Sequence, residues 1–142
     1  LFNSEEKKRI KAAVQEAELN TSGEIRVHLE NHCASKNVLD RAAQMFAQLE
    51  MHKTEARNGV LIYMAVKDHR FAIIGDADIN QKVGDDFWDS TKEKMLEQFK
   101  KGNLTEGLVE GILSSGQVLK KHFPYQSDDK NELSDDISFG KN

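Results

Sequence analysis

The sequence has little of what several classes of protein need. Of its 142 residues, one is cysteine and one is proline. No disulfide can therefore form within the chain, and nothing in it requires an oxidising compartment. No stretch approaches the roughly 20 apolar residues of a membrane-spanning helix, and the N-terminus lacks the basic and then apolar profile of a signal peptide. We expect a cytoplasmic protein, although the chain begins without methionine and an upstream segment is therefore conceivable.

An excess of positive charge is also missing. Lysine and arginine number 20 against 24 aspartate and glutamate residues, which gives a net charge of -4, whereas nucleic-acid-binding domains carry basic surfaces. We therefore expect no nucleic-acid partner. The length fits a single domain with its own core, which we place at residues 1–125. After Pro124 the chain turns polar, and residues 126–142 are predicted to form a mobile tail.

The first half of the chain alternates between helical and strand patterns. Asn3 and Glu6 resemble a capping box, and apolar residues at helical spacing follow as far as Ala17. Residues 24–30 alternate between apolar and polar side chains, which predicts a strand with one wet or partly covered face. Apolar residues at helical spacing predict a second helix over residues 38–49.

The second half supplies two more strands and two more helices. Residues 60–66 form an apolar run typical of a central strand, and residues 70–75 return as its hairpin partner after a short turn. A third helix is predicted from about Asp85 to Phe99. A fourth helix, with Asn103 and Glu106 as a second capping box, is predicted as far as Phe123. This order predicts a small mixed sheet covered by helices, with strands one and two parallel and strand three antiparallel to strand two.

That topology brings oxygen-bearing side chains to one edge of the sheet. Strands one and two begin at this edge and strand three ends there, so we expect five residues to converge: Glu24, Arg57, Asn58, Asp76 and Asp78. Close carboxylates raise each other's pKa unless a cation lies between them, and Ca²⁺ accepts the irregular oxygen ligands that loops provide. A phosphate held through such a cation, or an aspartyl nucleophile, would use similar residues. The simpler interpretation is that the aspartates end the strand and Arg57 is their counter-ion.

Two sharper motifs fit this segment only in part. Asp76, Asp78 and Asn80 match the first ligands of an EF-hand loop, but Gln81 stands where that loop needs glycine, and Phe87 where it needs glutamate. An aspartyl phosphatase of the haloacid-dehalogenase type would need a parallel strand before the aspartates, whereas residues 70–75 are predicted to lie in a hairpin. It would also need threonine or valine where this sequence has Asn80.

A softer metal site would draw on other residues. His28, His32 and Cys33 match no common zinc spacing, and we interpret them as surface residues on and after the first strand.

An ordered set of short segments resembles the TPM domain family in its compact bacterial form. The segments are Thr-Ser-Gly-Glu-Ile at 21–25, Arg-Asn-Gly-Val-Leu-Ile at 57–62, Phe-Ala-Ile-Ile-Gly-Asp at 71–76, the helix around residues 87–88, residues 103–111 and Asn-Glu-Leu-Ser-Asp at 131–135. The resemblance implies an α/β/α sandwich with a short mixed sheet. It also implies an acidic pocket at Glu24, Asp76 and Asp78. Asp85, Asp86 and Asp89 lie close enough in the sequence to be secondary candidates, although acids at the start of a helix also favour its N-terminus. Relatives include thylakoid proteins described as acid phosphatases and bacterial proteins reported to bind calcium or magnesium.

Three hypotheses of function follow. In the first, the chain is a TPM domain protein that binds Ca²⁺ or Mg²⁺ through Glu24, Asp76 and Asp78, with Asn58 as a further oxygen ligand and Arg57 available to an anionic group. In the second, it is a weak metal-dependent phosphatase, for which the sequence offers no clear nucleophile or base. In the third, the acidic edge binds an unidentified protein partner.

Overall fold

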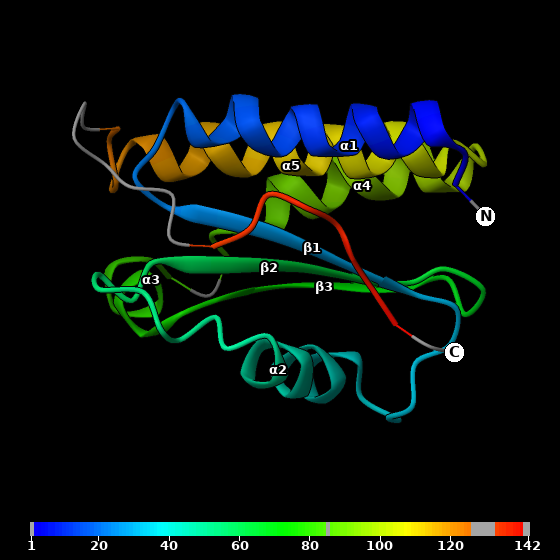
Figure 1. Ribbon diagram of the computed structural model, residues 1–142, viewed down its shortest axis with the longest axis horizontal. Coiled ribbons are helices and arrows are strands. Elements are labelled where there is room, and N and C mark those ends of the chain that lie inside the picture. Colours follow the sequence, from blue (N-terminus) through cyan, green and yellow to red (C-terminus); the bar gives the residue numbers. More distant parts are fainter. Residues whose placement is uncertain (1, 85, 126–132, 141–142) are drawn as a thin grey trace. The chain divides into compact units, whose positions relative to one another are not determined.

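The computed structural model describes residues 2–84, 86–125 and 133–140, and its chain divides into two compact units (Figure 1). A helical unit lies within Leu1–Gly23 and Val83–Lys130, and a sheet unit lies within Glu24–Lys82 and Asn131–Asn142. The described residues contain five helices and one open, mixed, four-stranded sheet. The predicted fold class, an α/β fold with a short mixed sheet of the α/β/α type, is confirmed.

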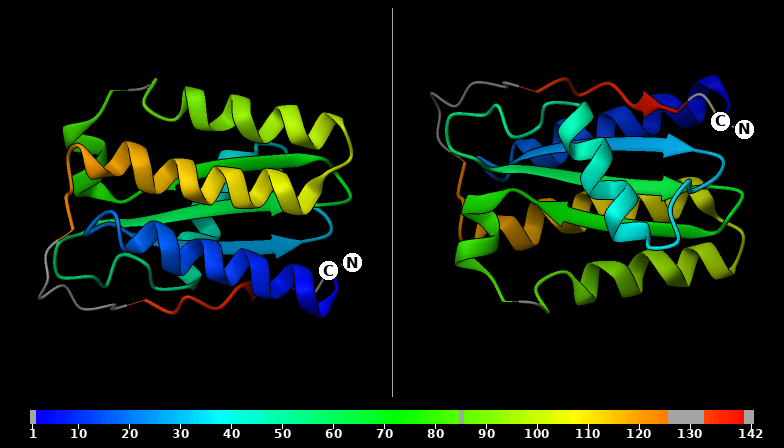
Figure 2. Two further views of the ribbon diagram at one scale, coloured as in Figure 1. Left: turned by 90° about the horizontal axis from the view of Figure 1, so that it is seen from above. Right: turned by 90° about the horizontal axis from the view of Figure 1, so that it is seen from below.

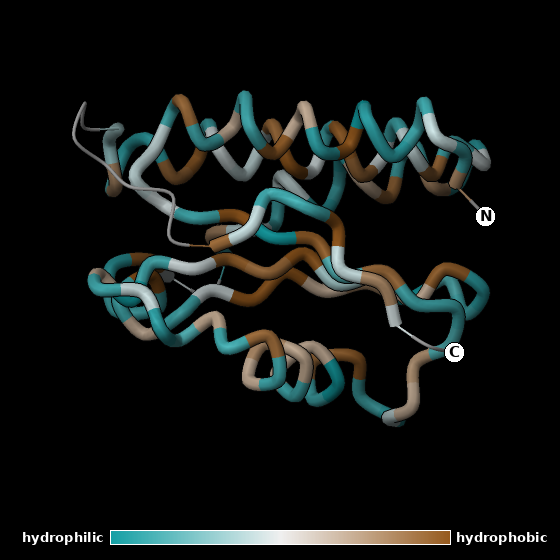
Figure 3. The backbone as a smooth tube through the Cα atoms, viewed as in Figure 1, coloured by the Kyte–Doolittle hydropathy of each residue, from teal (hydrophilic) through white to brown (hydrophobic). Residues whose placement is uncertain are grey.

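The helical unit consists of α1 (Ser4–Glu18), α4 (Asp89–Lys100) and α5 (Leu104–Lys120). Figure 2 shows α5 between α1 and α4 in one layer. Glycines on α5 allow this close packing, because a Cβ on Gly116 would lie 2.9 Å from the Cβ and backbone oxygen of Ala17. Apolar and polar residues alternate along α1 in Figure 3, and the buried positions of α1 are Ile10, Ala13, Val14 and Ala17.

One of the two predicted capping boxes is present. The Glu6 N–H donates to Asn3 Oδ1 over 2.8 Å, and the Asn3 N–H donates to Glu6 Oε1 over 3.0 Å. The capping box predicted at Asn103 is wrong, because that side chain makes no cap hydrogen bond to α5. Its side-chain NH2 group donates instead to Gln98 Oε1 of α4 over 3.1 Å.

The sheet unit has the strand order β3-β2-β1-β4. Its strands are β1 (Glu24–Glu30), β2 (Gly59–Ala65), β3 (Arg70–Gly75) and β4 (Ser138–Phe139). Strands β1 and β2 are parallel, and β2 and β3 are antiparallel, as predicted. Helix α2 (Val38–Gln48) crosses one face of this sheet, as the right-hand view of Figure 2 shows.

Three of the four polar residues of β1 are buried and Arg26 is partly buried, so this face is more enclosed than the wet or partly covered face that the alternation predicted. His28 is 1% exposed and Glu30 is 4% exposed. In the parallel register these residues pair with Tyr63 and Ala65 of β2. Tyr63 and Ala65 belong to the buried cluster that includes residues of α2, so helix and strand residues enclose the polar face.

Three further features differ from the sequence-based expectations. A short helix, α3 (Ala77–Lys82), follows β3 directly, and the third predicted helix begins at Asp89 instead of Asp85. Residues 126–132 of the predicted tail lie outside the described residues, whereas residues 133–140 include β4, a strand parallel to β1. No helix among the described residues is long and apolar enough to cross a membrane.

Candidate functional site

The segments expected to meet at one edge of the sheet do meet there. Glu24 pairs with Gly59 at the start of the parallel register, and its N–H donates to the Asn58 carbonyl over 3.0 Å. The Asp76 N–H donates to the Gly59 carbonyl over 2.9 Å, and the Asp78 N–H donates to the Arg57 carbonyl over 3.3 Å. Backbone hydrogen bonds therefore tie all three predicted carboxylate residues to residues 57–59. We call Glu24, Arg57, Asn58, Asp76 and Asp78 the edge cluster.

Asp76 is the central carboxylate of the edge cluster and is paired with Arg57. Arg57 donates from Nε to Asp76 Oδ2 and from a terminal nitrogen to Oδ1, each over 2.8 Å. The Ala77 N–H adds a bond of 2.7 Å to Oδ1. Burial raises the pKa of Asp76, but the Arg57 guanidinium and the Ala77 N–H outweigh burial and hold the pKa below its ordinary value. Asp76 is therefore an ionised, buried carboxylate whose hydrogen bonds come from protein donors instead of water.

The two partners in this ion pair differ in exposure. The Asp76 side chain is 5% exposed, whereas the Arg57 side chain is 50% exposed. The Arg57 backbone has φ of 53°, in the left-handed region that non-glycine residues rarely adopt. The carboxylate is thus fixed, while its counter-ion is a surface side chain that solvent can draw away.

The other members of the edge cluster each have a partner of their own. Asp78 lies 3.3 Å from Lys82 Nζ on the next turn of α3. Glu24 is 4% exposed, and its Oε1 accepts the Leu133 N–H over 2.7 Å. Asn58 is 5% exposed, and its N–H donates to Thr54 Oγ1 over 3.2 Å. The cluster gathers hard oxygen groups, but protein donors already engage each carboxylate.

Among the described residues, no group of three or more His, Cys, Asp or Glu side chains is arranged to hold an ion. Carboxylate and amide oxygens are the ligands that Ca²⁺ and Mg²⁺ prefer, so the chemistry of the edge cluster fits, but an ion would have to replace the present partners. Of the secondary candidates, Asp86 and Asp89 are exposed in the helical unit, and Asp85 lies outside the described residues.

A second group of ionisable residues was missed by the sequence analysis. We call His28, Glu30, Arg41 and Tyr63 the Glu30 cluster. Arg41 donates from Nε to Glu30 Oε2 over 2.8 Å and from a terminal nitrogen to Oε1 over 2.9 Å. The Tyr63 hydroxyl also donates to Oε2, and His28 Nε2 lies 3.3 Å from Oε1. The one available signal was Tyr63, whose hydroxyl needs a partner inside an otherwise apolar strand.

This network fixes the charge states of its members. Burial raises the pKa of Glu30, but hydrogen bonds from Arg41, Tyr63 and His28 outweigh burial and lower the pKa to about 2. Burial, together with the Glu30 carboxylate, raises the pKa of Tyr63. Burial lowers the pKa of His28 despite the opposite effect of Glu30. An ion pair between Arg41 on α2 and Glu30 on β1 is therefore present at neutral pH.

The expectation that His28, His32 and Cys33 are surface residues holds for one of them only. The side chain of His32 is 59% exposed and lies 2.9 Å from Asp68 Oδ1. His28 is buried because β1 places it opposite Tyr63, with the two rings stacked at 6.0 Å between centroids. Cys33 is partly buried, and its N–H donates to Asp68 Oδ2 over 2.7 Å.

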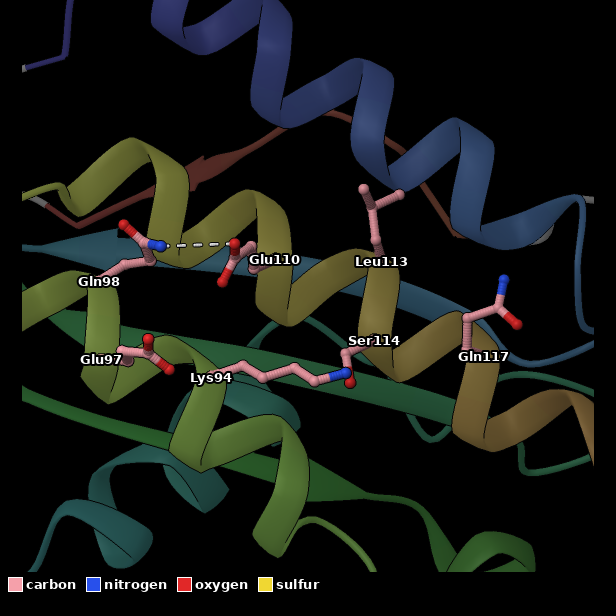
Figure 4. Close-up of a pocket in the computed structure, with 7 residues that line it drawn as sticks. All are labelled: Lys94, Glu97, Gln98, Glu110, Leu113, Ser114 and Gln117. Carbon is pink, nitrogen blue, oxygen red and sulfur yellow. Dashed lines mark hydrogen bonds between the residues drawn. The ribbon is translucent and has the colours of Figure 1, made fainter.

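The helical unit carries a surface groove between α4 and α5 (Figure 4). Its volume is about 470 Å³. Gln98 and Glu110 cross it with a hydrogen bond of 3.5 Å. Seven residues line the groove, namely Lys94, Glu97, Gln98, Glu110, Leu113, Ser114 and Gln117. None of these was a candidate in the sequence analysis. The side chains that line the groove are basic, acidic, polar and apolar, so they do not indicate one class of ligand.

Comparison with known proteins places the chain in a family. A family model described as TPM domain matches residues 1–118. The chain belongs to the TPM domain family. The resemblance found in its short segments is therefore confirmed, and the matched range includes every member of the edge cluster and of the Glu30 cluster. No curated protein matches the chain.

Solved structures share the fold of this TPM domain. The NMR structure of the BA42 protein from the psychrophilic bacterium Bizionia argentinensis is 50% identical, with a TM-score of 0.92 over 99% of this chain and 96% of that one. The N-terminal domain of a protein from P. gingivalis is 18% identical, with a TM-score of 0.71 over 89% of this chain and 82% of the other. The N-terminal domain of cg2496 from Corynebacterium glutamicum is 12% identical, with a TM-score of 0.65 over 99% and 81%. The last two comparisons show the fold alone.

Proposed function

We propose that this TPM domain protein binds a divalent cation, Ca²⁺ or Mg²⁺, at the edge cluster. The observation that supports this most directly is the register of the sheet. It ties Glu24, Asp76 and Asp78 to the same short segment, residues 57–59, through backbone hydrogen bonds. Carboxylates gathered at one edge of a sheet are stabilised by nearby positive charge. In the present structure Arg57 supplies that charge at Asp76 and Lys82 supplies it at Asp78, whereas Glu24 accepts the Leu133 N–H.

Arg57 is the group that a cation would replace at Asp76. Both oxygens of Asp76 accept hydrogen bonds from Arg57, so a bound ion and the guanidinium compete for the same carboxylate. Arg57 can leave because half of its side chain is exposed and a guanidinium is fully solvated in water. Its release would also make it available to an anionic group near the ion. Asn58 would supply an amide oxygen, and water would complete the coordination.

The two candidate ions make different demands on this site. Ca²⁺ accepts six to eight oxygens in irregular geometry, whereas Mg²⁺ requires an octahedron and retains several waters. Ligands from a strand start, a loop and a strand end suit the more tolerant ion. Metal binding by the secondary candidates Asp85, Asp86 and Asp89 remains a separate prediction. The cytoplasmic location of the protein also remains a prediction.

The test is a titration of metal-stripped protein with Ca²⁺ and then Mg²⁺, followed by backbone amide NMR. We expect saturable shifts centred on residues 23–24, 57–59 and 76–78. Asp76→Asn should abolish saturable binding while the protein stays folded, because the amide keeps the Ala77 contact but loses the charge. Arg57→Gln should bind more tightly than the wild type, since the competing cation is gone. Glu97→Gln, on an exposed part of α4, is the control and should bind as the wild type does.

Retained affinity in Asp76→Asn would overturn the assignment of the site. Diffuse shifts without saturation would overturn the cation proposal and leave the edge cluster as a set of strand-end ion pairs. A pull-down with the wild type and Asp76→Asn would then test the third hypothesis, in which the acidic edge binds a protein partner.

A metal-dependent phosphatase is the alternative use of the same ion. A bound divalent ion polarises a phosphoryl oxygen and lowers the pKa of attacking water. Such an activity would additionally need a nucleophile or base beside the ion, a role for which the edge cluster offers its carboxylates only. Hydrolysis of a generic phosphoester that survives repurification and disappears in Asp76→Asn would support it. Hydrolysis that persists in Asp76→Asn would assign the activity to a contaminant.

A further inference from the structure

Residues 133–140, which we call the C-terminal strap, lie along the free side of β1. Figures 1 and 2 show this red segment beside β1, at the edge of the sheet unit. Ser138 and Phe139 pair with His28 and Leu29 in parallel register. The Gly140 N–H donates to the Leu29 carbonyl over 2.8 Å. The strap is thus an added edge strand, held by few backbone hydrogen bonds.

The strap covers the polar positions of β1 one after another. At one end its Leu133 N–H binds the Glu24 carboxylate over 2.7 Å. In the middle Ser138 Oγ lies 2.8 Å from His28 Nδ1. At the other end Gly140 lies against Glu30, and a Cβ on this glycine would come within 2.6 Å of Glu30 Cβ. The strap is one reason why these alternating polar side chains are buried.

Leu133 anchors the strap at the edge cluster. Its side chain packs against the buried cluster of the sheet unit. The position of a Cβ on Gly59 would lie 3.5 Å from Leu133 Cδ1, an ordinary van der Waals distance, so the Leu133 side chain lies against Gly59. The strap therefore rests directly on the segment that carries Arg57 and Asn58.

Glu24 cannot serve the strap and a cation equally well. The Leu133 N–H presents its positive end to Oε1, and Glu24 is 4% exposed, so a hydrated ion has little access while the strap is docked. An ion bound to Glu24 would repel the N–H dipole and need the space above the carboxylate. Strap and ion therefore compete for one side chain.

We propose that the C-terminal strap is a latch on the cation site: it undocks from β1 when the ion binds, and its docking weakens ion binding. This inference rests on the proposed function. The latch is suited to this role because two paired residues and a few side-chain contacts form an element of low local stability. Linkage requires that the effect be reciprocal, so a change that loosens the docked strap and leaves the ion's ligands intact tightens ion binding by the same factor.

The experiment uses the full chain, with Ca²⁺ as the probe. Hydrogen exchange at the Gly140 amide reports strap docking, and amide NMR shifts at residues 76–78 report ion binding. Two variants loosen the strap at different points: Ser138→Ala removes the contact with His28, and Gly140→Ala places a methyl group against Glu30. Glu24→Gln keeps an oxygen for Leu133 but removes the charge that attracts the ion. Ser90→Ala, an exposed serine on α4, is the matched control.

We expect the Gly140 amide of the wild type to be protected without Ca²⁺ and to lose that protection at saturation. Ser138→Ala should bind Ca²⁺ roughly fivefold more tightly, which corresponds to the loss of one hydrogen bond from the competing state. Gly140→Ala should change affinity in the same direction, and Ser90→Ala should not. Glu24→Gln should keep its strap docked at every Ca²⁺ concentration and bind the ion weakly.

Two results would overturn the latch, and they can be told apart. If Ca²⁺ binds at residues 76–78 while Gly140 stays protected and Ser138→Ala has unchanged affinity, the latch is wrong and the cation site stands. If neither the wild type nor the loosened variants bind Ca²⁺ saturably, the cation site is wrong and the latch fails with it.

Discussion

The Arg41→Met substitution removes the cation from a buried ion pair and keeps a side chain of similar length. The Glu30 side chain is 0% exposed and that of Arg41 is 15% exposed. Both Glu30 oxygens accept from Arg41, and only Tyr63 and His28 would remain as their side-chain partners in the Glu30 cluster. A buried carboxylate that loses its counter-ion costs about 3–5 kcal/mol.

The pKa of Glu30 gives a second route to the magnitude. Its pKa falls from 4.5 to about 2 on folding, which corresponds to about 3 kcal/mol of stability at neutral pH. Tyr63 and His28 supply part of this amount, so Arg41 alone accounts for less than the whole. The remainder of the loss comes from burying an unpaired charge. We therefore expect Arg41→Met to lower the free energy of unfolding by about 3 kcal/mol at pH 7.

Urea unfolding of the wild type, Arg41→Met and Arg9→Met measures this loss against a matched control. Arg9 pairs with Glu106 on the surface of the helical unit, where the two side chains are 52% and 39% exposed. An exposed pair contributes about 0–1 kcal/mol, so the same substitution at Arg9 should be nearly neutral. Equal losses in the two variants would refute the argument, because burial would then make no difference to the ion pair.

The pH dependence supplies an independent check. Because the folded pKa of Glu30 lies below the unfolded value of 4.5, its contribution is present above that pH and is lost as the pH falls toward about 2. In Arg41→Met burial would raise the pKa of Glu30, and protonation would then stabilise the variant as the pH falls. The difference in unfolding free energy between wild type and Arg41→Met should therefore narrow in acid. A difference that stays constant from neutral pH to about pH 3 would contradict this account.

Two further predictions concern the helical unit. Gly116→Ala should destabilise the protein by about 1–3 kcal/mol in urea unfolding, because its methyl group would meet the backbone and Cβ of Ala17. Gln117→Ala on the exposed side of the same helix should be nearly neutral, and a stabilised Gly116→Ala would show that helix propensity outweighs the close contact. Asn3→Ala should cost about 1 kcal/mol through loss of the capping box with Glu6, and an unchanged thermal midpoint would show that the cap contributes nothing.

Local patterns in the sequence predicted most elements of the fold. The alternation in residues 24–30 and the apolar run that follows Gly59 predicted β1 and β2, because side-chain periodicity in a strand depends on backbone geometry alone. The short turn before Arg70 predicted the antiparallel hairpin, and the helix between β1 and β2 predicted their parallel pairing. These rules also brought Glu24, Asn58 and Asp76 to one edge of the sheet before any contact was known.

Other features could not be predicted because they depend on residues far apart in the chain. Strand β4 is two residues long and has no periodicity of its own, so it exists only where β1 offers a free edge. The cap predicted at Asn103 failed over a shorter separation, because its side chain bonds to Gln98 of the preceding helix, five residues away, and makes no cap hydrogen bond. Short polar elements of this kind are decided by whichever partner tertiary packing brings nearest.

The sequence by itself determined the order of α1, β1, α2, β2, β3, α4 and α5, the family and the oxygen-rich edge of the sheet. Only the tertiary structure decided the partners and the charge states of most of these polar side chains. It buried Glu30 with Arg41 and Tyr63 and placed Leu133 on Glu24, whereas the pairing of Arg57 with Asp76 was already one interpretation of the sequence. The physical reason is that a polar pattern specifies which face a side chain takes, whereas its partner and its charge state depend on which distant groups share that face.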